Sequence, residues 1–238
     1  MVYIEGKHWR SIILPVYYLI SQMETDDGFP KQLGDSLVND FATLHYEQRN
    51  ITFVCADPDN YKTTEQDVNI ILGWFQRIGI LFHEVFILDN RMSMHEKGQY
   101  MKHTGIVFLL GGNPITQIGF MRKNNLFNFI QSTAHILVGM SAGAINMCRV
   151  SLCSKDDEND TTIVYSGLGF VDVTIEPHFD IHNMKLMKEE LFPVSNNNAI
   201  LAVPDNSFIR VEDEKMSFHG EAYVIYKNRI WFHNEREK

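Results

Sequence analysis

The feature that most constrains the fold is an alternation of strand-length apolar runs with helix-length amphipathic segments. The runs cover residues 10–19, 51–55, 81–88 and 105–110. Runs that are apolar at nearly every position are typical of strands covered on both faces. The alternation therefore predicts an α/β fold with a doubly wound, mainly parallel sheet and helices on both faces.

The segments between and after these runs predict the remaining elements. Asp35 is expected to cap the first helix, and Thr64-x-x-Asp67 precedes the apolar pattern of the second. Helices are expected over residues 35–48, 64–79, 93–102, 114–129 and 183–191, and further strands over residues 171–175 and 200–203. Antiparallel strands toward the C-terminus are expected over residues 208–211, 216–218 and 222–232. No linker interrupts the sequence, so we expect a single domain over residues 1–238.

Residues 133–148 predict a strand, a sharp turn and a helix in direct succession. Ser141 stands between Gly139 and Gly143, which lack the side chains that would collide as the strand passes into the helix. Such a turn holds the serine hydroxyl above the sheet edge. It also aims the N–H of Ala142 and the positive end of the helix at a group bound there.

Polar residues follow other predicted strands as well. Gly111-Gly112-Asn113 comes directly after the run at 105–110, and His178 follows the strand predicted at 171–175. Asp205 follows the apolar segment that ends at Val203. In a doubly wound sheet, strand ends on the same edge converge on one crevice, so these groups are expected to meet Ser141 there.

Serine, histidine and aspartate are the residue types that nucleophilic acyl transfer requires. A serine hydroxyl becomes an effective nucleophile when an imidazole accepts its proton and a carboxylate orients that imidazole. We therefore expect Ser141 as the nucleophile, His178 as the base and Asp205 as the acid. The N–H groups of Gly112 and Ala142 are expected to bind the oxyanion of the transition state.

The order serine, histidine, acid differs from that of α/β-hydrolases, in which the acid precedes the histidine. The order and the surrounding residues resemble the dipeptidase E and cyanophycinase family of serine peptidases, whose fold is similar to class I glutamine amidotransferases. Gly111-Gly112-Asn113 resembles the oxyanion loop of this family, and residues 139–144 resemble its nucleophile turn. Pro177-His178-Phe179 matches its histidine block.

The acid block and the specificity residue depart from the family pattern. Residues 203–205 are similar to the family's Pro-Glu-Gly block, but Asp205 replaces the glutamate and Asn206 the glycine. Dipeptidase E cleaves dipeptides with an N-terminal aspartate and holds that carboxylate with an arginine soon after the histidine. Here Lys185 and Lys188 occupy this interval, and lysine does not reproduce the bidentate fork of arginine.

The resemblance implies two further site residues and leaves three functions open. Asn113 is a candidate substrate-binding residue, and Asp156 is the candidate for a second acid of the family. The resemblance implies a serine peptidase that hydrolyses short peptides through an acyl-enzyme. The alternatives are a non-catalytic protein that binds small peptides, and an amidase or esterase acting on a non-peptide acyl substrate.

Composition limits the classes of partner. A net charge of -9 and no basic stripe argue against nucleic-acid binding, and no apolar run reaches the roughly 20 residues of a membrane span. Three cysteines, an odd number, favour free thiols and a cytoplasmic location. No cofactor or metal is expected. The expected partner is a short peptide or amino-acid-derived substrate, and whether the chain forms a homodimer stays open.

Overall fold

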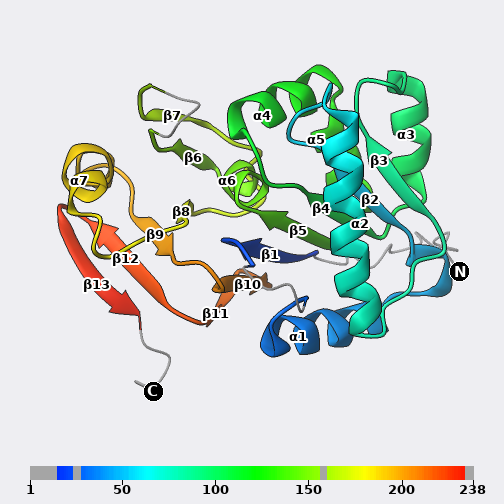
Figure 1. Ribbon diagram of the computed structural model, residues 1–238, viewed down its shortest axis with the longest axis horizontal. Coiled ribbons are helices and arrows are strands. Elements are labelled where there is room, and N and C mark those ends of the chain that lie inside the picture. Colours follow the sequence, from blue (N-terminus) through cyan, green and yellow to red (C-terminus); the bar gives the residue numbers. More distant parts are fainter. Residues whose placement is uncertain (1–14, 24–27, 156–159, 234–238) are drawn as a thin grey trace, which may run out of the picture.

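The computed structural model describes residues 15–23, 28–155 and 160–233. Its main sheet has seven strands in the order β11-β10-β1-β5-β4-β2-β3 (Figure 1). Strands β1 to β5 of this sheet run parallel, whereas β10 and β11 are antiparallel additions at one edge. The strands are β1 (Val16–Ile20), β2 (Ile51–Val54), β3 (Val85–Leu88), β4 (Ile106–Leu109), β5 (Ile136–Met140), β10 (Phe208–Glu212) and β11 (Lys215–His219). The predicted mainly parallel sheet is confirmed, and residues 10–14 of the first predicted run lie outside the described residues.

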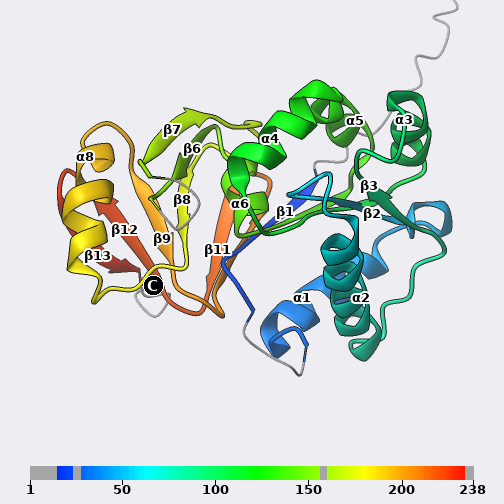
Figure 2. The same ribbon diagram turned by 45° about the horizontal axis from the view of Figure 1, so that its top comes forward.

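Helices cover both faces of this sheet, as Figure 2 shows. Tyr18 and Phe53 point into a core formed with α1 and α2, whereas their neighbours Leu19 and Val54 point into a core formed with α3 to α6. This alternation follows from the two-residue period of a strand. The helices are α1 (Lys31–Ala42), α2 (Tyr61–Arg77), α3 (Met94–Lys102), α4 (Pro114–Lys123), α5 (Leu126–Thr133) and α6 (Ala142–Met147), with a 3-10 turn at Tyr46–Gln48.

Two helices begin earlier than their apolar patterns predict. Helix α1 begins at Lys31, directly after Pro30, so the prediction that Asp35 caps it is wrong. Pro30 cannot donate a backbone hydrogen bond and suits a helix start, where donors are unpaired in any case. Asp35 instead forms an ion pair with Lys31, one turn earlier on the same helix, with 2.5 Å between Nζ and Oδ2. Helix α2 likewise begins before Thr64, which is buried within it.

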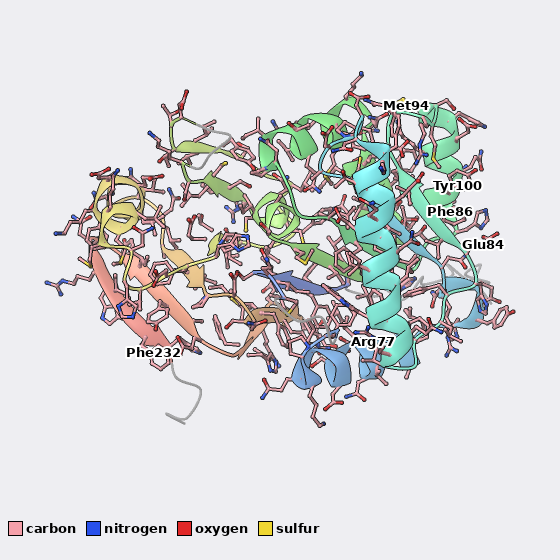
Figure 3. All side chains as sticks on the ribbon, viewed as in Figure 1. Arg77, Glu84, Phe86, Met94, Tyr100 and Phe232 are labelled. Atoms are coloured by element: carbon pink, nitrogen blue, oxygen red, sulfur yellow. The ribbon has the colours of Figure 1, made fainter. Side chains whose placement is uncertain are left out.

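Helix α3 follows the edge strand β3 and packs against it. Ser93 caps α3 by accepting the N–H of Glu96, whose carboxylate accepts the N–H of Ser93 in return. The ring of Tyr100 on this helix stacks on Phe86 of β3 with centroids 4.4 Å apart (Figure 3). Aromatic packing thus fixes α3 against the edge strand.

A second sheet of four strands carries the C-terminal part of the chain. Its order is β13-β12-β9-β8, with β8 and β9 parallel. The predicted antiparallel set is therefore divided between two sheets. The chain passes from β11 to β12 at Gly220 (φ 83°), where a Cβ atom would overlap the side chain of Ser207. The strands are β8 (Thr174–Pro177), β9 (Ile200–Val203), β12 (Ala222–Tyr226) and β13 (Arg229–His233).

The remaining described elements are a β-hairpin after α6 and a helical segment between β8 and β9. An antiparallel hairpin of β6 (Val150–Cys153) and β7 (Ile163–Ser166) follows α6. The helix predicted at residues 183–191 is three consecutive turns, α7 (Met184–Leu186), a π turn (Met187–Leu191) and α8 (Phe192–Ser195). None of the described helices combines the length and the apolar character needed to cross a bilayer.

Candidate active site

Ser141 lies on a strained turn between β5 and α6. Its φ of 49° is uncommon for a residue with a side chain. A Cβ atom at Gly139 would approach the Sδ of Met147 to 2.5 Å, and one at Gly143 would overlap the carbonyl oxygen of Leu109. Both glycines are therefore required for the close passage of strand into helix. The backbone N–H of Ser141 is fixed by the carbonyl oxygen of Ile20 at 2.9 Å.

The structure brings Ser141, His178 and Asp205 into one hydrogen-bonded chain. Ser141 Oγ lies 2.7 Å from His178 Nε2, and His178 Nδ1 lies 2.9 Å from Asp205 Oδ1. With the Nδ1 proton donated to Asp205, Nε2 is the acceptor for the Ser141 hydroxyl. The side chains of His178 and Asp205 are 40% and 29% exposed, so the pair can be reached from solvent.

His178 and Asp205 come from the second sheet, not from the main sheet that carries Ser141. Strands β8 and β9 run parallel with Pro177 opposite Val203, so the segments that follow the two strands leave the sheet at the same end. His178 turns back with a φ of 55°. On the other strand, Asn206 donates its N–H to the carbonyl oxygen of Gln22 at 2.7 Å. This contact ties the acid segment to the chain that follows β1.

Ser21 is a site residue that the sequence did not single out. Its hydroxyl oxygen accepts the backbone N–H of His178 at 2.7 Å and donates to Asp205 Oδ1 at 2.9 Å. The residue is completely buried. Its place directly after the first strand was the one available signal, because strand ends in such sheets line the crevice. Ser21 thus links the histidine backbone to the carboxylate.

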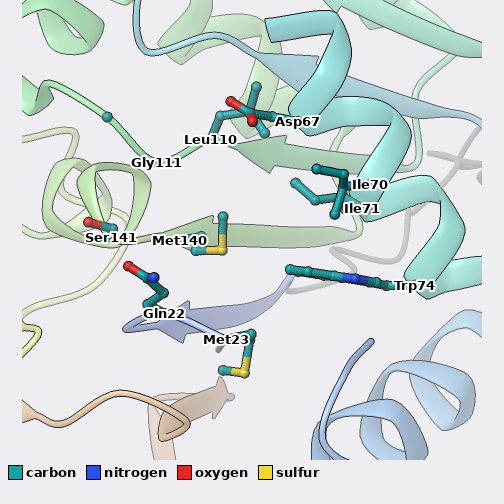
Figure 4. A pocket seen from close by; sticks show the side chains of 11 residues that line it. Gln22, Met23, Asp67, Ile70, Ile71, Trp74, Leu110, Gly111, Met140 and Ser141 are labelled. Atoms are coloured by element: carbon teal, nitrogen blue, oxygen red, sulfur yellow. The ribbon is translucent and has the colours of Figure 1, made fainter. Parts of the chain in front are cut away.

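A pocket of about 670 Å³ opens beside Ser141 (Figure 4). It lies between the end of the main sheet and one face of α2. The lining residues are Gln22, Met23, Asp67, Ile70, Ile71, Trp74, Leu110, Gly111, Gly112, Met140 and Ser141. A second pocket of about 340 Å³ adjoins it and shares Asp67, Leu110, Gly111 and Gly112. The loop after β4 therefore separates two neighbouring cavities.

The remaining predicted site residues differ in their placement. Gly112 lines both pockets with a φ of 130°, and a Cβ atom there would come within 2.7 Å of the Cβ of Ala56. Ala142 is buried as the first residue of α6. Asn113 lines the smaller pocket, and its Oδ1 caps α4 by accepting the N–H groups of Ile115 and Thr116, both at 3.0 Å.

The two lysines do not line the described pocket beside Ser141. Lys185 lies on α7 and Lys188 on the π turn, and both are exposed. Neither is among the described residues that line the pocket. Asp156 lies outside the described residues.

Glu176 is a buried carboxyl group two residues before His178. Ser154 donates its hydroxyl to Glu176 Oε1 at 2.6 Å. Burial raises the pKa of Glu176 to about 8, with a smaller contribution from the nearby charge of Glu190, while the hydrogen bond from Ser154 opposes the shift. The neutral acid is therefore the form that suits the folded protein at pH 7.

The free energy of unfolding of the wild type should fall between pH 5 and pH 8, and Glu176→Gln should abolish this fall. The folded chain holds the Glu176 proton up to about pH 8, whereas the unfolded chain releases it near the ordinary value of 4.5. Stability therefore falls as pH rises through this window. Urea unfolding should give similar stabilities for both proteins at pH 5 and a more stable variant at pH 8, by about 2 kcal/mol or more. Parallel pH curves for the two proteins would contradict the assignment.

Known proteins resemble this chain in sequence profile and in fold. The sequence profile of peptidase family S51 matches residues 21–219. The fold is similar to a peptidase from an acI-B1 Actinobacterium, with a TM-score of 0.65, 14% identity, and coverage of 94% of this chain and 96% of that one. It is also similar to a protein provisionally named peptidase E from Listeria monocytogenes EGD-e, with a TM-score of 0.61, 16% identity, and coverage of 86% and 98%. No curated protein sequence matches the chain significantly.

Proposed function

The chain belongs to peptidase family S51, and from that premise we propose that it hydrolyses short peptides with Ser141, His178 and Asp205 as its catalytic triad. The observation that carries the proposal is the pair of hydrogen bonds from Ser141 Oγ to His178 Nε2 and from His178 Nδ1 to Asp205 Oδ1. Each distance is within hydrogen-bond reach for proton transfer and for orientation of the ring.

In the acylation step, Ser141 Oγ attacks the scissile carbonyl carbon while His178 Nε2 accepts the hydroxyl proton. The imidazolium that forms is stabilised by the carboxylate of Asp205. The tetrahedral intermediate then collapses, the C–N bond breaks, and His178 returns the proton to the leaving amine. An acyl-enzyme ester on Ser141 remains.

In the second step, water replaces the amine as the reacting partner. His178 takes a proton from the water as its oxygen attacks the ester carbonyl, and it then returns a proton to Ser141 Oγ as the acid product leaves. The N–H groups of Gly112 and Ala142 are the proposed oxyanion donors in both steps. Ala142 follows Ser141 directly at the start of α6, and Gly112, in the loop after β4, lines the same pocket as Ser141, which supports this role.

The size of the cavity supports a short substrate. A pocket of about 670 Å³ falls within the range of roughly 300–1,000 Å³ that is typical of small-ligand sites. The test is hydrolysis of a dipeptide and tripeptide panel by the full chain, with release of free amine as the readout. Turnover of peptides supports the proposal, whereas turnover confined to acyl esters would favour esterase chemistry at the same triad.

Ser21→Ala should lower kcat by about tenfold while KM stays within twofold of the wild type. The variant leaves the His178 N–H without its acceptor and Asp205 without one donor, and an unpaired buried polar group costs about 1–3 kcal/mol. We expect the variant to disturb the orientation of the imidazole and to leave substrate binding unchanged. Steady-state kinetics on the preferred dipeptide measures both constants.

The control for this variant is Ser195→Ala. Ser195 is also completely buried, donates its hydroxyl to the carbonyl of Phe192 at 2.8 Å and accepts the N–H of Asn228 at 3.1 Å. Ser195→Ala thus loses one donated and one accepted hydrogen bond, as Ser21→Ala does, but in α8 and away from the triad. An equal loss of kcat in both variants would reduce the role of Ser21 to general stability.

A further inference from the structure

One face of α2 forms a wall of the pocket beside Ser141. Asp67, Ile70, Ile71 and Trp74 line it, and their spacing of three, four and seven residues is that of one helix face. Figure 4 shows these side chains on the helix opposite Met140 and the end of β5. The wall is therefore apolar along most of its length and carries one carboxylate.

Asp67 is the charged group of this wall, and it has no compensating partner within the described part of the chain. No ion pair or side-chain hydrogen bond is formed by its carboxylate there. Among the described lining residues of both pockets there is no lysine, arginine or histidine. An unpaired carboxylate in the pocket that the nucleophile also lines is a charge that a bound ligand could compensate.

The surroundings of the carboxyl group also favour a charged partner. Asp67 is exposed as a residue, but the helix and the strand ends around its carboxyl group partly exclude water, which raises the pKa of Asp67. A cation at this position would recover the lost solvation and form a charge-assisted hydrogen bond. An anion would instead add a second negative charge to the same cavity.

We propose that Asp67 is a specificity-determining residue that receives a positively charged nitrogen of the substrate. The proposal rests on the proposed peptidase function and names its substrate class as cationic peptides, in contrast to the N-terminal aspartate preference that the resemblance implies for dipeptidase E. The charged nitrogen is either the free α-ammonium group or the side chain of a lysine or arginine residue.

The apolar part of the wall fits the second component of such a substrate. Lysine and arginine carry an alkyl stem that can lie along Ile70 and Ile71 while the charged end reaches a carboxylate. The indole of Trp74 adds an aromatic surface, which cations favour. Ile70 is 54% exposed in the free protein, so a substrate stem would cover apolar surface that now faces solvent.

The test measures peptide binding to Ser141→Ala by calorimetry, so that turnover does not enter the result. Four peptides separate the sources of charge: Lys-Ala, norleucyl-Ala with the α-ammonium alone, Nα-acetyl-Lys-Ala with the side-chain charge alone, and Nα-acetyl-norleucyl-Ala with neither. Asp-Ala is the acidic comparison. The same peptides are then measured with Asp67→Asn and with Glu65→Gln, each in the Ser141→Ala background.

Glu65→Gln is the matched control because it makes the same change of charge on the same helix. Its carboxylate faces Arg91 at 2.6 Å and does not line the described pocket. We expect Asp67→Asn to weaken binding of the cationic peptides about tenfold, with the doubly neutral peptide unchanged within twofold. We expect Glu65→Gln to leave every affinity within twofold.

The singly charged peptides assign the source of the nitrogen: whichever of them loses affinity in Asp67→Asn carries the group that Asp67 receives. The proposal is overturned if Asp67→Asn leaves the cationic peptides within twofold, if Asp-Ala binds more tightly than Lys-Ala, or if no cationic peptide binds. Absence of turnover by the wild type, with Asp67-dependent binding intact, would count against the peptidase function alone.

Discussion

Ser141→Ala should lower kcat/KM for dipeptide hydrolysis by roughly 10⁵-fold, because it removes the only atom that forms the acyl-enzyme in the proposed mechanism. Ser141 Oγ lies 2.7 Å from His178 Nε2, so the variant leaves the base without the proton that it is placed to accept. Residual turnover would come from the oxyanion donors and from substrate positioning. Steady-state hydrolysis of the best dipeptide of the panel measures the loss.

The folding of this variant should be close to that of the wild type. Alanine keeps the Cβ atom that the strained turn already accommodates at a φ of 49°, so a thermal unfolding midpoint within a few degrees is expected. A well-folded Ser141→Ala protein that retains a tenth or more of the activity would exclude Ser141 as the nucleophile.

Asp205→Asn should lower kcat by roughly 10³-fold to 10⁴-fold, the second largest effect. An asparagine in this place keeps the shape of the side chain, but it removes the charge that stabilises the imidazolium. It also replaces one carboxylate oxygen by an NH2 donor, which favours the wrong tautomer of His178 when it faces Nδ1. The substitution also changes the contact with Ser21, which donates to the same oxygen. Kinetics on the same dipeptide, with KM determined separately, measures the effect.

Asp180→Asn is the matched control for this aspartate. Asp180 is an exposed residue two positions after His178, and its Oδ1 accepts the N–H of His182 at 2.9 Å. We expect its kcat within twofold of the wild type. A fall of less than threefold in Asp205→Asn would show that another carboxylate orients His178, or that none is needed.

Much of the main sheet could be predicted because its strands are apolar at nearly every position. The runs that contain Phe53 and Phe108 predicted strands covered on both faces, and both residues are completely buried in the structure. Helix starts were less predictable, because the cap at Pro30 precedes the apolar pattern by several residues. The second sheet could not be assigned, since local pattern does not state which strand an isolated segment such as 222–226 will pair with.

Some residues of the candidate site could be predicted from the sequence and others could not. Ser141, His178 and Asp205 could be singled out because each follows a strand and carries reactive chemistry, and the structure brings the three together. Ser21 and Asp67 could not be assigned roles in the site. A serine after a strand and an aspartate near a helix start are common in many proteins. Ser21 is distinguished by its hydrogen bonds with His178 and Asp205, and Asp67 by its place in the pocket that Ser141 also lines.

The most direct measurement of the central claim, that His178 activates Ser141 as a nucleophile, is covalent labelling with a fluorophosphonate. Intact mass and peptide mapping should show one adduct per wild-type chain, located on Ser141. Labelling should be absent in Ser141→Ala and at least 100-fold slower in His178→Ala, since the unassisted hydroxyl is a poor nucleophile, and removing a base typically costs about 10²-fold to 10⁴-fold. An adduct on another residue, or equal labelling of the wild type and Ser141→Ala, would contradict the claim.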